Sequence, residues 1–261
     1  DGWRTCLQKL HQSASSNAEE VKFYCIQVVQ HVVTTRYGTL SEEDRAALRS
    51  SLMVFTRDII AKVPQSNLIK TKLAVVLVRM MKHDYPERWN FFRDFLPMLD
   101  LGLDVIVLFL RVLKCIDEEI VDGDDRHCRT RDELARSAHI KDSMRNTVNP
   151  KIVDALYQIL VKTHTAHPAI AKVGTEGSQH PHRIAWISSA SSFVSWIDIN
   201  LVANDRFLAL FYNFLSVPGL QVEACEALHE IVVKKMDPEK KIPLIGQIKW
   251  VSVAHIHSQD L

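Results

Sequence analysis

Hydrophobic residues recur along most of this chain at spacings of three and four, which is the pattern of amphipathic α-helices. For example, Val21, Cys25, Val28, Val29 and Val32 fall on one side of a helix. The pattern predicts helices throughout and no sheet. The expected helices cover residues 2–12, 18–36, 41–63, 68–83, 87–99, 103–121, 132–146, 150–164, 184–199, 203–216, 219–236 and 239–250.

Residues that begin and end helices support these boundaries. Ser41 followed by Asp44 resembles a capping box with a shorter acid, in which the serine hydroxyl accepts a free backbone N–H. Gly38 stands where a C-terminal glycine would stop the preceding helix. Pro86 is expected at the first helical position of the segment 87–99.

Short turns between successive helices predict antiparallel helix pairs stacked in the order of the chain. The first helices of the expected pairs recur irregularly, at intervals that straddle the period of roughly 40 residues found in HEAT repeats. We therefore expect an all-α fold, a right-handed α-solenoid of roughly five to six degenerate HEAT-like helix pairs. A compact helical bundle is the structural alternative.

The expected organisation has four parts. Residues 1–164 form a first run of repeats and residues 184–250 a second run. Between them, 165–183 has no hydrophobic period and contains Gly, Pro and His, so we expect a flexible loop. Residues 251–261 are expected to form a tail.

Composition agrees with a helical protein and narrows the class. The chain has 261 residues, of which 47% are hydrophobic, with only 8 Gly and 9 Pro. The net charge of +1 argues against a simple electrostatic nucleic-acid binder, although a locally basic face stays possible. Five scattered cysteines without a CxxC pair suit a reducing compartment. The longest apolar run, 101–116, contains charged residues and is too short to span a bilayer, so a soluble intracellular protein is expected.

The sequence contains no motif for catalysis or for a cofactor. A phosphate-binding loop, a dinucleotide-binding glycine motif, a nucleophile elbow and the HExxH zinc motif are all absent. His180-x-His182 could chelate a metal together with His164 or His167, but these histidines lack the cysteine spacing of structural zinc sites. A solvated loop explains them better, and we expect a non-enzymatic protein without metal or cofactor.

Two charged segments are candidates for binding. The acidic run 117–133 is expected to be a soluble loop between repeats, and its functional alternative is a contact for a basic partner. On the helix 132–146, Arg136, Lys141 and Arg145 are assigned to one broad side. Such cations either keep a helix face soluble or hold a nucleic-acid backbone without reading bases.

Five stretches, taken together, resemble one family. They are VKFYCIQVVQHVV (21–33), DYPERWNFF (84–92), IKDSMR (140–145), FVSWIDINLVANDRF (193–207) and EACEALHEIVVKKMDP (223–238). Their order is similar to that in the exportin-T family of tRNA nuclear-export receptors, within the importin-β superfamily. The Tyr-Pro-x-x-Trp element is shared across the superfamily, whereas the 140–145 and 193–207 stretches are closer to exportin-T.

The resemblance implies the amino-terminal part of a RanGTP-dependent receptor that shuttles between nucleus and cytoplasm with tRNA as cargo. The implied partners are Ran in its GTP-bound form, tRNA and nuclear pore proteins, without membrane insertion. The alternative is a protein-cargo transport receptor, or a general HEAT scaffold, without RNA binding. The implied inner helices are 41–63, 86–97 and 132–146. Polar residues on them are the expected Ran contacts, namely Glu42, Arg49, Glu87, Arg88 and Asn90. The expected tRNA contacts are Arg136, Lys141 and Arg145.

The resemblance also interprets the polar segment 195–207 as a junction between two helices of one repeat. It implies packing roles for Trp196, Ile199, Leu201 and Phe207, and implies that Asn204 and Asp205 cap the second helix. Relative to the family, the chain is expected to begin within the first repeat and to end in an unrelated sequence. An incomplete or alternatively spliced gene product would explain both features.

Overall fold

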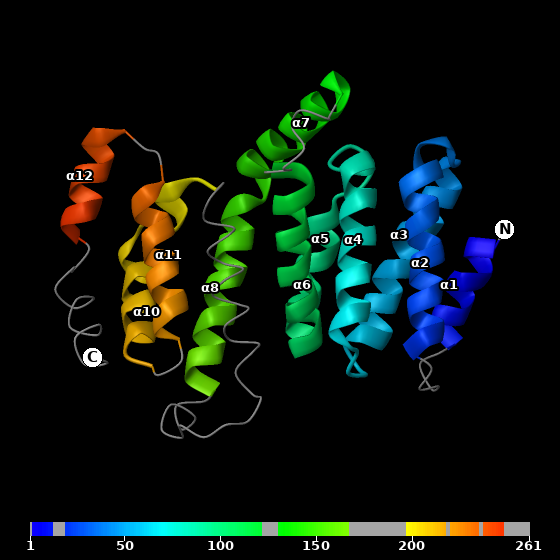
Figure 1. Ribbon diagram of the computed structural model, residues 1–261, viewed down its shortest axis with the longest axis horizontal. Coiled ribbons are helices and arrows are strands. Elements are labelled where there is room, and N and C mark those ends of the chain that lie inside the picture. The colour runs from blue at the N-terminus through cyan, green and yellow to red at the C-terminus, as the bar shows by residue number, and fades with distance from the viewer. Residues whose placement is uncertain are drawn as a thin grey trace. The chain divides into compact units, whose positions relative to one another are not determined.

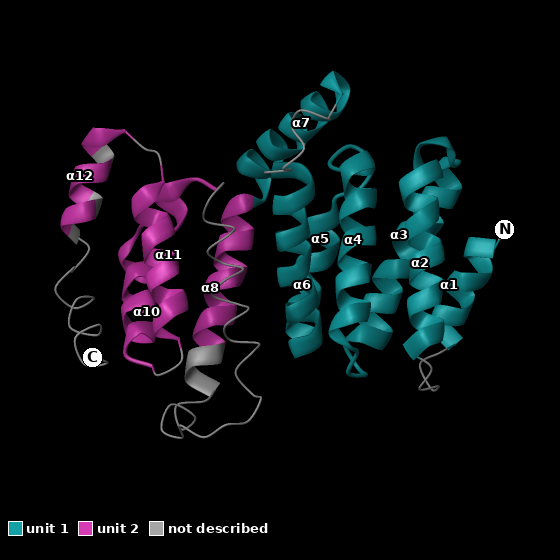
Figure 2. Ribbon diagram, viewed as in Figure 1, with its two compact units in different colours: residues 1–148 teal, residues 149–261 magenta. Residues whose placement is uncertain are grey.

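The computed structural model describes residues 2–12, 19–121, 130–166, 197–217, 220–234 and 237–247. Every regular element in these ranges is helical, so the expected all-α class is confirmed. The chain divides into two compact units, residues 1–148 and 149–261, which are coloured separately in Figure 2. Each unit is described by itself.

The first unit is built from stacked helix pairs. Its elements are α1 (Gly2–Gln12), α2 (Glu19–Arg36), η1 (Tyr37–Thr39), α3 (Glu42–Phe55), η2 (Thr56–Ile60), α4 (Asn67–Asp84), α5 (Phe91–Phe95), η3 (Leu96–Leu101), α6 (Leu103–Ile116), η4 (Asp117–Val121) and α7 (Arg131–Thr147). Helices α2, α4 and α6 lie side by side in chain order (Figure 1). Helix α1 packs on α2 and α3, so a second layer accompanies the first. This is the stacked-pair arrangement of an α-solenoid.

Apolar side chains fill the space between the two layers. Helix α6 is buried along most of its length, and Phe109 on it stacks against Phe95 of α5 with ring centroids 5.7 Å apart. Phe91 packs between Phe92 and Phe95, with its centroid 5.1 Å and 5.2 Å from theirs. Each aromatic side chain of this size buries roughly 150–250 Å². The short helix α5 is therefore held by packing, since five residues are too few to form a stable helix alone.

The helix starts follow local sequence closely. The Ser41 hydroxyl accepts a hydrogen bond from the Asp44 backbone N–H at 3.1 Å, so the expected N-cap of α3 is confirmed. The carboxylate of Asp44 bonds Arg4 of α1. A complete capping box, which the sequence analysis did not identify, starts α7 at Thr130 and Glu133.

The expected helix 87–99 was wrong at its start. Residues 85–88 form a turn in which the Arg88 and Trp89 backbone N–H groups both donate to the carbonyl of Asp84, at 2.8 Å and 3.0 Å. Helix α5 begins only at Phe91, because the Asn90 side chain accepts the Arg93 backbone N–H at 3.2 Å. Pro86 thus belongs to the turn that ends α4.

The second unit contains α8 (Asn149–Ala166), η6 (Ile199–Leu201), α10 (Asp205–Leu215), α11 (Gln221–Val233) and α12 (Pro238–Gln247). Helices α10 and α11 pack against each other as a pair. The expected helix 184–199 lies largely outside the described residues, as do the expected loop 165–183 and tail 251–261.

Asn204 is the N-cap of α10, as expected, since its Oδ1 accepts the Phe207 backbone N–H at 3.2 Å. Asp205 is the first residue of the helix and is not its cap. Ile199 and Phe207 are buried, and Leu201 is half-buried. The dense polar sequence therefore starts two helical elements, because Asp198 likewise caps η6. Trp196 lies outside the described residues.

Candidate functional site

A buried carboxylate ends helix α4. Asp84, its last residue, is 0% exposed. Its Oδ2 accepts hydrogen bonds from the Tyr37 hydroxyl, at 2.6 Å, and from Nη1 of Arg49, while Nη1 of Arg45 lies 3.7 Å from Oδ1. Removing a carboxylate from water costs several kcal/mol unless partners compensate it. Residues of η1 and α3 therefore fix the position at which α4 ends.

Tyr37 and Arg49 keep their protonation states at neutral pH. Burial raises the pKa of the Tyr37 phenol, and its hydrogen bond to Asp84 acts in the same direction, so the hydroxyl stays a donor. Burial works to lower the pKa of the Arg49 guanidinium, but its hydrogen bonds with Glu42 and Asp84 hold that pKa above the ordinary value. The cluster therefore provides a fixed electrostatic support and is not poised for proton transfer.

Arg49 connects this buried cluster to the surface. Its Nη2 donates to Oε1 of Glu42 at 2.6 Å, and this hydrogen bond is the main reason that the pKa of Glu42 is lowered. The Nε of Arg88 lies 4.0 Å from Oε2 of Glu42, with both side chains more than half exposed. Three of the expected Ran contacts, Glu42, Arg49 and Arg88, are thus brought together. Arg49 itself is buried and serves mainly to hold the other two.

The fourth expected Ran contact, Glu87, lies in the same turn and joins it to helix α7. Its Oε2 accepts from Nη1 of Arg136 at 3.2 Å, and its Oε1 lies 2.5 Å from Nε2 of His139. Two carboxylates, Glu42 and Glu87, therefore flank Arg88 on the surface of the turn. The mixed charges suit recognition of a polar protein surface, in which complementary charges set specificity.

Arg136 has a structural role that the sequence analysis missed. Besides Glu87, its guanidinium donates to the backbone carbonyls of Lys82 at 3.0 Å, His83 at 3.0 Å and Tyr85 at 2.5 Å. The last carbonyls of a helix lack intrahelical partners, and a cation is favourable at that end of the helix dipole. Arg136 of α7 thereby caps α4 from outside.

The remaining expected contacts lie apart from this cluster. Asn90 caps α5 through its side chain. Arg145 is nine residues from Arg136, and at 100° per residue the two side chains leave α7 in opposite directions. The expected single surface containing Arg136, Lys141 and Arg145 is therefore not formed. Lys141 is half-buried, and Arg145 is exposed with its Nη1 3.4 Å from Oδ1 of Asp142.

Few of the residues that organise this site are apparent from local sequence patterns. Tyr37 and Asp84 are 47 positions apart, and no local pattern connects them. His139 could have been found, since it follows Arg136 by three residues and therefore lies on the same side of a helix. Lys82 and His83 at the end of α4 line a hollow beside the turn, together with Glu87, Arg88 and Arg136.

The described residues were searched for metal-binding groups and for membrane-spanning helices. No group of three His, Cys, Asp or Glu side chains there is placed to hold a metal ion. The loop histidines His167, His180 and His182 lie outside those residues, and the side chain of His164 is not described. No described helix is sufficiently long and apolar to cross a membrane.

Comparisons with known proteins identify the family of this chain. Residues 66–228 match the family model described as exportin 1-like protein. The chain is 37% identical over 100% of its length to exportin-T of Dictyostelium discoideum, covering 22% of that protein. It is 33% identical to human exportin-T over 95% of the chain and 24% of the relative, and 31% identical to exportin-T of Arabidopsis thaliana over 98% of the chain and 25% of the relative.

The chain spans about a quarter of the length of these relatives, and its similarity is to their amino-terminal part. The family match extends over both compact units and includes the turn 85–88 and helix α7. This chain therefore belongs to the exportin 1-like protein family.

Proposed function

We propose that this chain is the amino-terminal part of a RanGTP-dependent nuclear export receptor for tRNA and acts as a non-catalytic binding scaffold. The observation that carries the proposal is the similarity to exportin-T proteins from animals, plants and an amoeba over nearly the whole chain. The proposed partners are RanGTP, tRNA and nuclear pore proteins, and the proposed location is shuttling between nucleus and cytoplasm.

RanGTP and tRNA can be coupled through the conformation of the scaffold, if each binds one conformation more tightly than another. If RanGTP and tRNA both bind one conformation better, each ligand strengthens the other by the same factor. The surface supports this idea at one place, because Glu87 of the proposed Ran surface is bonded to Arg136 of α7, the helix that carries Lys141 and Arg145. A ligand on either side would act on the same turn.

The proposed Ran surface is tested by changing only its exposed members. We expect Glu42→Gln, Glu87→Gln and Arg88→Gln together to weaken binding of RanGTP to the 261-residue chain by about tenfold or more, since close charge pairs at interfaces contribute about 1.5–7 kcal/mol. Arg49 and Asn90 are left intact because they support the fold. Isothermal titration calorimetry measures the affinity. An unchanged affinity in a folded triple variant would remove these residues from the Ran surface.

The proposed tRNA contact is tested by salt dependence. We expect Lys141→Gln with Arg145→Gln to weaken tRNA binding independently of tRNA sequence and to lower the slope of log K against log salt by about 1.5, because each phosphate contact contributes about 0.7–0.9. Fluorescence anisotropy with and without RanGTP measures both quantities. A protein-cargo receptor without RNA binding predicts no salt-sensitive tRNA affinity in the unmodified chain, and that result would favour the alternative function.

A further inference from the structure

The two layers of the first unit differ in how their cations are compensated. On the layer that contains α3 and α5, arginines are paired with carboxylates. The pairs are Arg45 and Arg49 with Asp84, Arg57 with Asp58, and Arg93 with Asp94. Positive charge on that layer is therefore largely neutralised by its neighbours.

Three cations on α4 and α6 have no carboxylate partner among the described residues: Lys72, Lys82 and Arg111. The Nζ of Lys72 lies 3.4 Å from Oε1 of Gln30 and 5.6 Å from the centroid of the Phe23 ring, both on α2. Nη1 of Arg111 donates to the Thr71 hydroxyl at 2.7 Å. Neutral groups thus position Lys72 and Arg111 without cancelling their charge, whereas Lys82 lines a hollow that Glu119 and Glu133 also line.

Arg111 has a further unused donor. Its Nε is buried and lacks a hydrogen-bond acceptor, although Nη1 is held by Thr71. A buried donor without an acceptor costs about 1–3 kcal/mol. The buried Nε is out of reach of a ligand, but the half-buried side chain is already oriented by Thr71, and fork-shaped donors are suited to phosphate oxygens.

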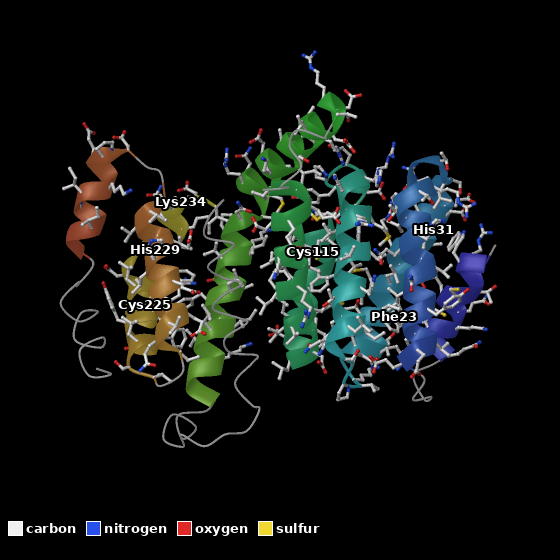
Figure 3. All side chains as sticks on the ribbon, in the orientation of Figure 1. Phe23, His31, Cys115, Cys225, His229 and Lys234 are labelled. Carbon is white, nitrogen blue, oxygen red and sulfur yellow. The ribbon has the colours of Figure 1, made fainter. Side chains whose placement is uncertain are left out.

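Three cations on α4 form a row along the helix. Lys72, Arg79 and Lys82 lie within about 80° of one another around the helix and are spread over about 15 Å of its axis. Arg79 is held between the Thr34 hydroxyl, at 2.7 Å, and Glu119, at 3.0 Å. Figure 3 labels Phe23 and His31 on α2, the helix that packs beside this row. The row thus places ammonium and guanidinium groups beside hydroxyl and amide side chains and beside one carboxylate, that of Glu119.

We propose that this α4–α6 face, defined by Lys72, Lys82 and Arg111 with Gln30 and Thr71 beside them, binds the phosphate backbone of RNA. It would be a contact surface separate from Lys141 and Arg145, and it rests on the proposed function in requiring an RNA cargo. Lysine, arginine, threonine and glutamine are the side chains that contact phosphate oxygens. An acidic protein segment fits less well, because protein interfaces depend on apolar anchors. Apart from the Phe23 ring beside Lys72, the groups that contact Lys72 and Arg111 are polar.

The test compares RNA binding by two variants of the 261-residue chain with equal loss of charge. The first carries Lys72→Gln, Lys82→Gln and Arg111→Gln. The control carries Arg57→Gln, Lys62→Gln and Arg93→Gln, three exposed cations that have carboxylate partners. We expect the first variant to bind a 12-base-pair RNA duplex at least tenfold more weakly, with a salt slope lower by about 2–3. We expect the control to stay within twofold of the unmodified chain.

A second pair of measurements keeps the result interpretable. Because Arg111 is partly buried, the double variant Lys72→Gln/Lys82→Gln is measured alongside, and it should lower the slope by about 1.5–2. Equal losses in the face variant and the control, or no loss in either, would overturn the proposal. Binding of polyglutamate in place of the duplex would also overturn it, in favour of an acidic protein partner.

The duplex also separates this proposal from the proposed function. Duplex binding that depends on the α4–α6 face, without preference for tRNA and without strengthening by RanGTP, would support the face and contradict the receptor function. Conversely, RanGTP-dependent tRNA binding that is unaffected in the face variant would support the receptor and remove this face from it.

Discussion

Asp84→Ala should lower the free energy of unfolding of the first unit by about 3–5 kcal/mol, because removing one partner leaves buried charge and a buried donor uncompensated. Arg49 is 8% exposed and would keep only Glu42 at the surface, while the Tyr37 hydroxyl would lose its 2.6 Å acceptor. Urea unfolding followed by circular dichroism measures the change. The turn 85–88 should also lose order, since Asp84 ends the helix from which it leaves.

Two further variants identify the cause of that loss. Asp84→Asn keeps the shape and an oxygen acceptor but removes the charge, so we expect it to be less destabilising than Asp84→Ala. Asp58→Ala removes a carboxylate that pairs only with the exposed side chains Arg57 and Lys62, and it should leave the unfolding midpoint unchanged. If Asp84→Ala unfolded at the same urea concentration as the unmodified chain, the buried cluster would not be what fixes the end of α4.

Arg136→Ala should have the second-largest effect, a loss of about 2 kcal/mol, because it leaves carbonyls at the end of α4 without their donor. Three backbone carbonyls and Glu87 currently share this one guanidinium. Arg136→Lys should recover little of the stability, since an ammonium group cannot reproduce the planar fork. The urea midpoint again measures the change.

The control for Arg136 lies on the same helix. Arg145→Ala should leave stability unchanged, because Arg145 is exposed and forms one surface pair with Asp142. RNA affinity should show the reverse order. We expect Arg145→Ala to weaken RNA binding, because it removes a proposed contact, and Arg136→Ala to have no direct effect on RNA binding. If Arg136→Ala were fully stable yet bound RNA weakly, Arg136 would return to the RNA surface and its role as an external cap would be wrong.

The hydrophobic period identified most of the described helices, because each depends on residues three and four positions apart. The expected start and end of α1, 2–12, agree with the structure, and those of α4 differ by one residue at each end. The N-caps Ser41 and Asn204 were equally accessible, since a cap joins a side chain to a backbone N–H three residues later. The family resemblance added the stretches 140–145 and 193–207, which periodicity alone would not distinguish.

The candidate site could be predicted from the sequence only in part. Sequence reasoning selected Glu42, Glu87 and Arg88 as polar residues on neighbouring helices, and the structure places them around one turn. Helical spacing alone puts Arg136 and Arg145 on opposite sides of one helix. Only the tertiary structure shows that Arg136 faces the end of α4. The α4–α6 face could be defined only from the structure, because its definition depends on which cations lack a carboxylate neighbour.

The sequence by itself determined the helical class, most boundaries of the described helices and the N-caps Ser41 and Asn204, because these follow from interactions within a few residues along the chain. Only the tertiary structure decided that Asp84 is buried against Tyr37 and Arg49, that Arg136 caps α4, and that Lys72 and Arg111 face neutral partners. Each of these contacts joins residues about 35 to 54 positions apart. Whether a charged side chain stabilises the fold or is available to bind a ligand depends on its neighbours. In a stack of helices these neighbours come from other helices, far away in the sequence.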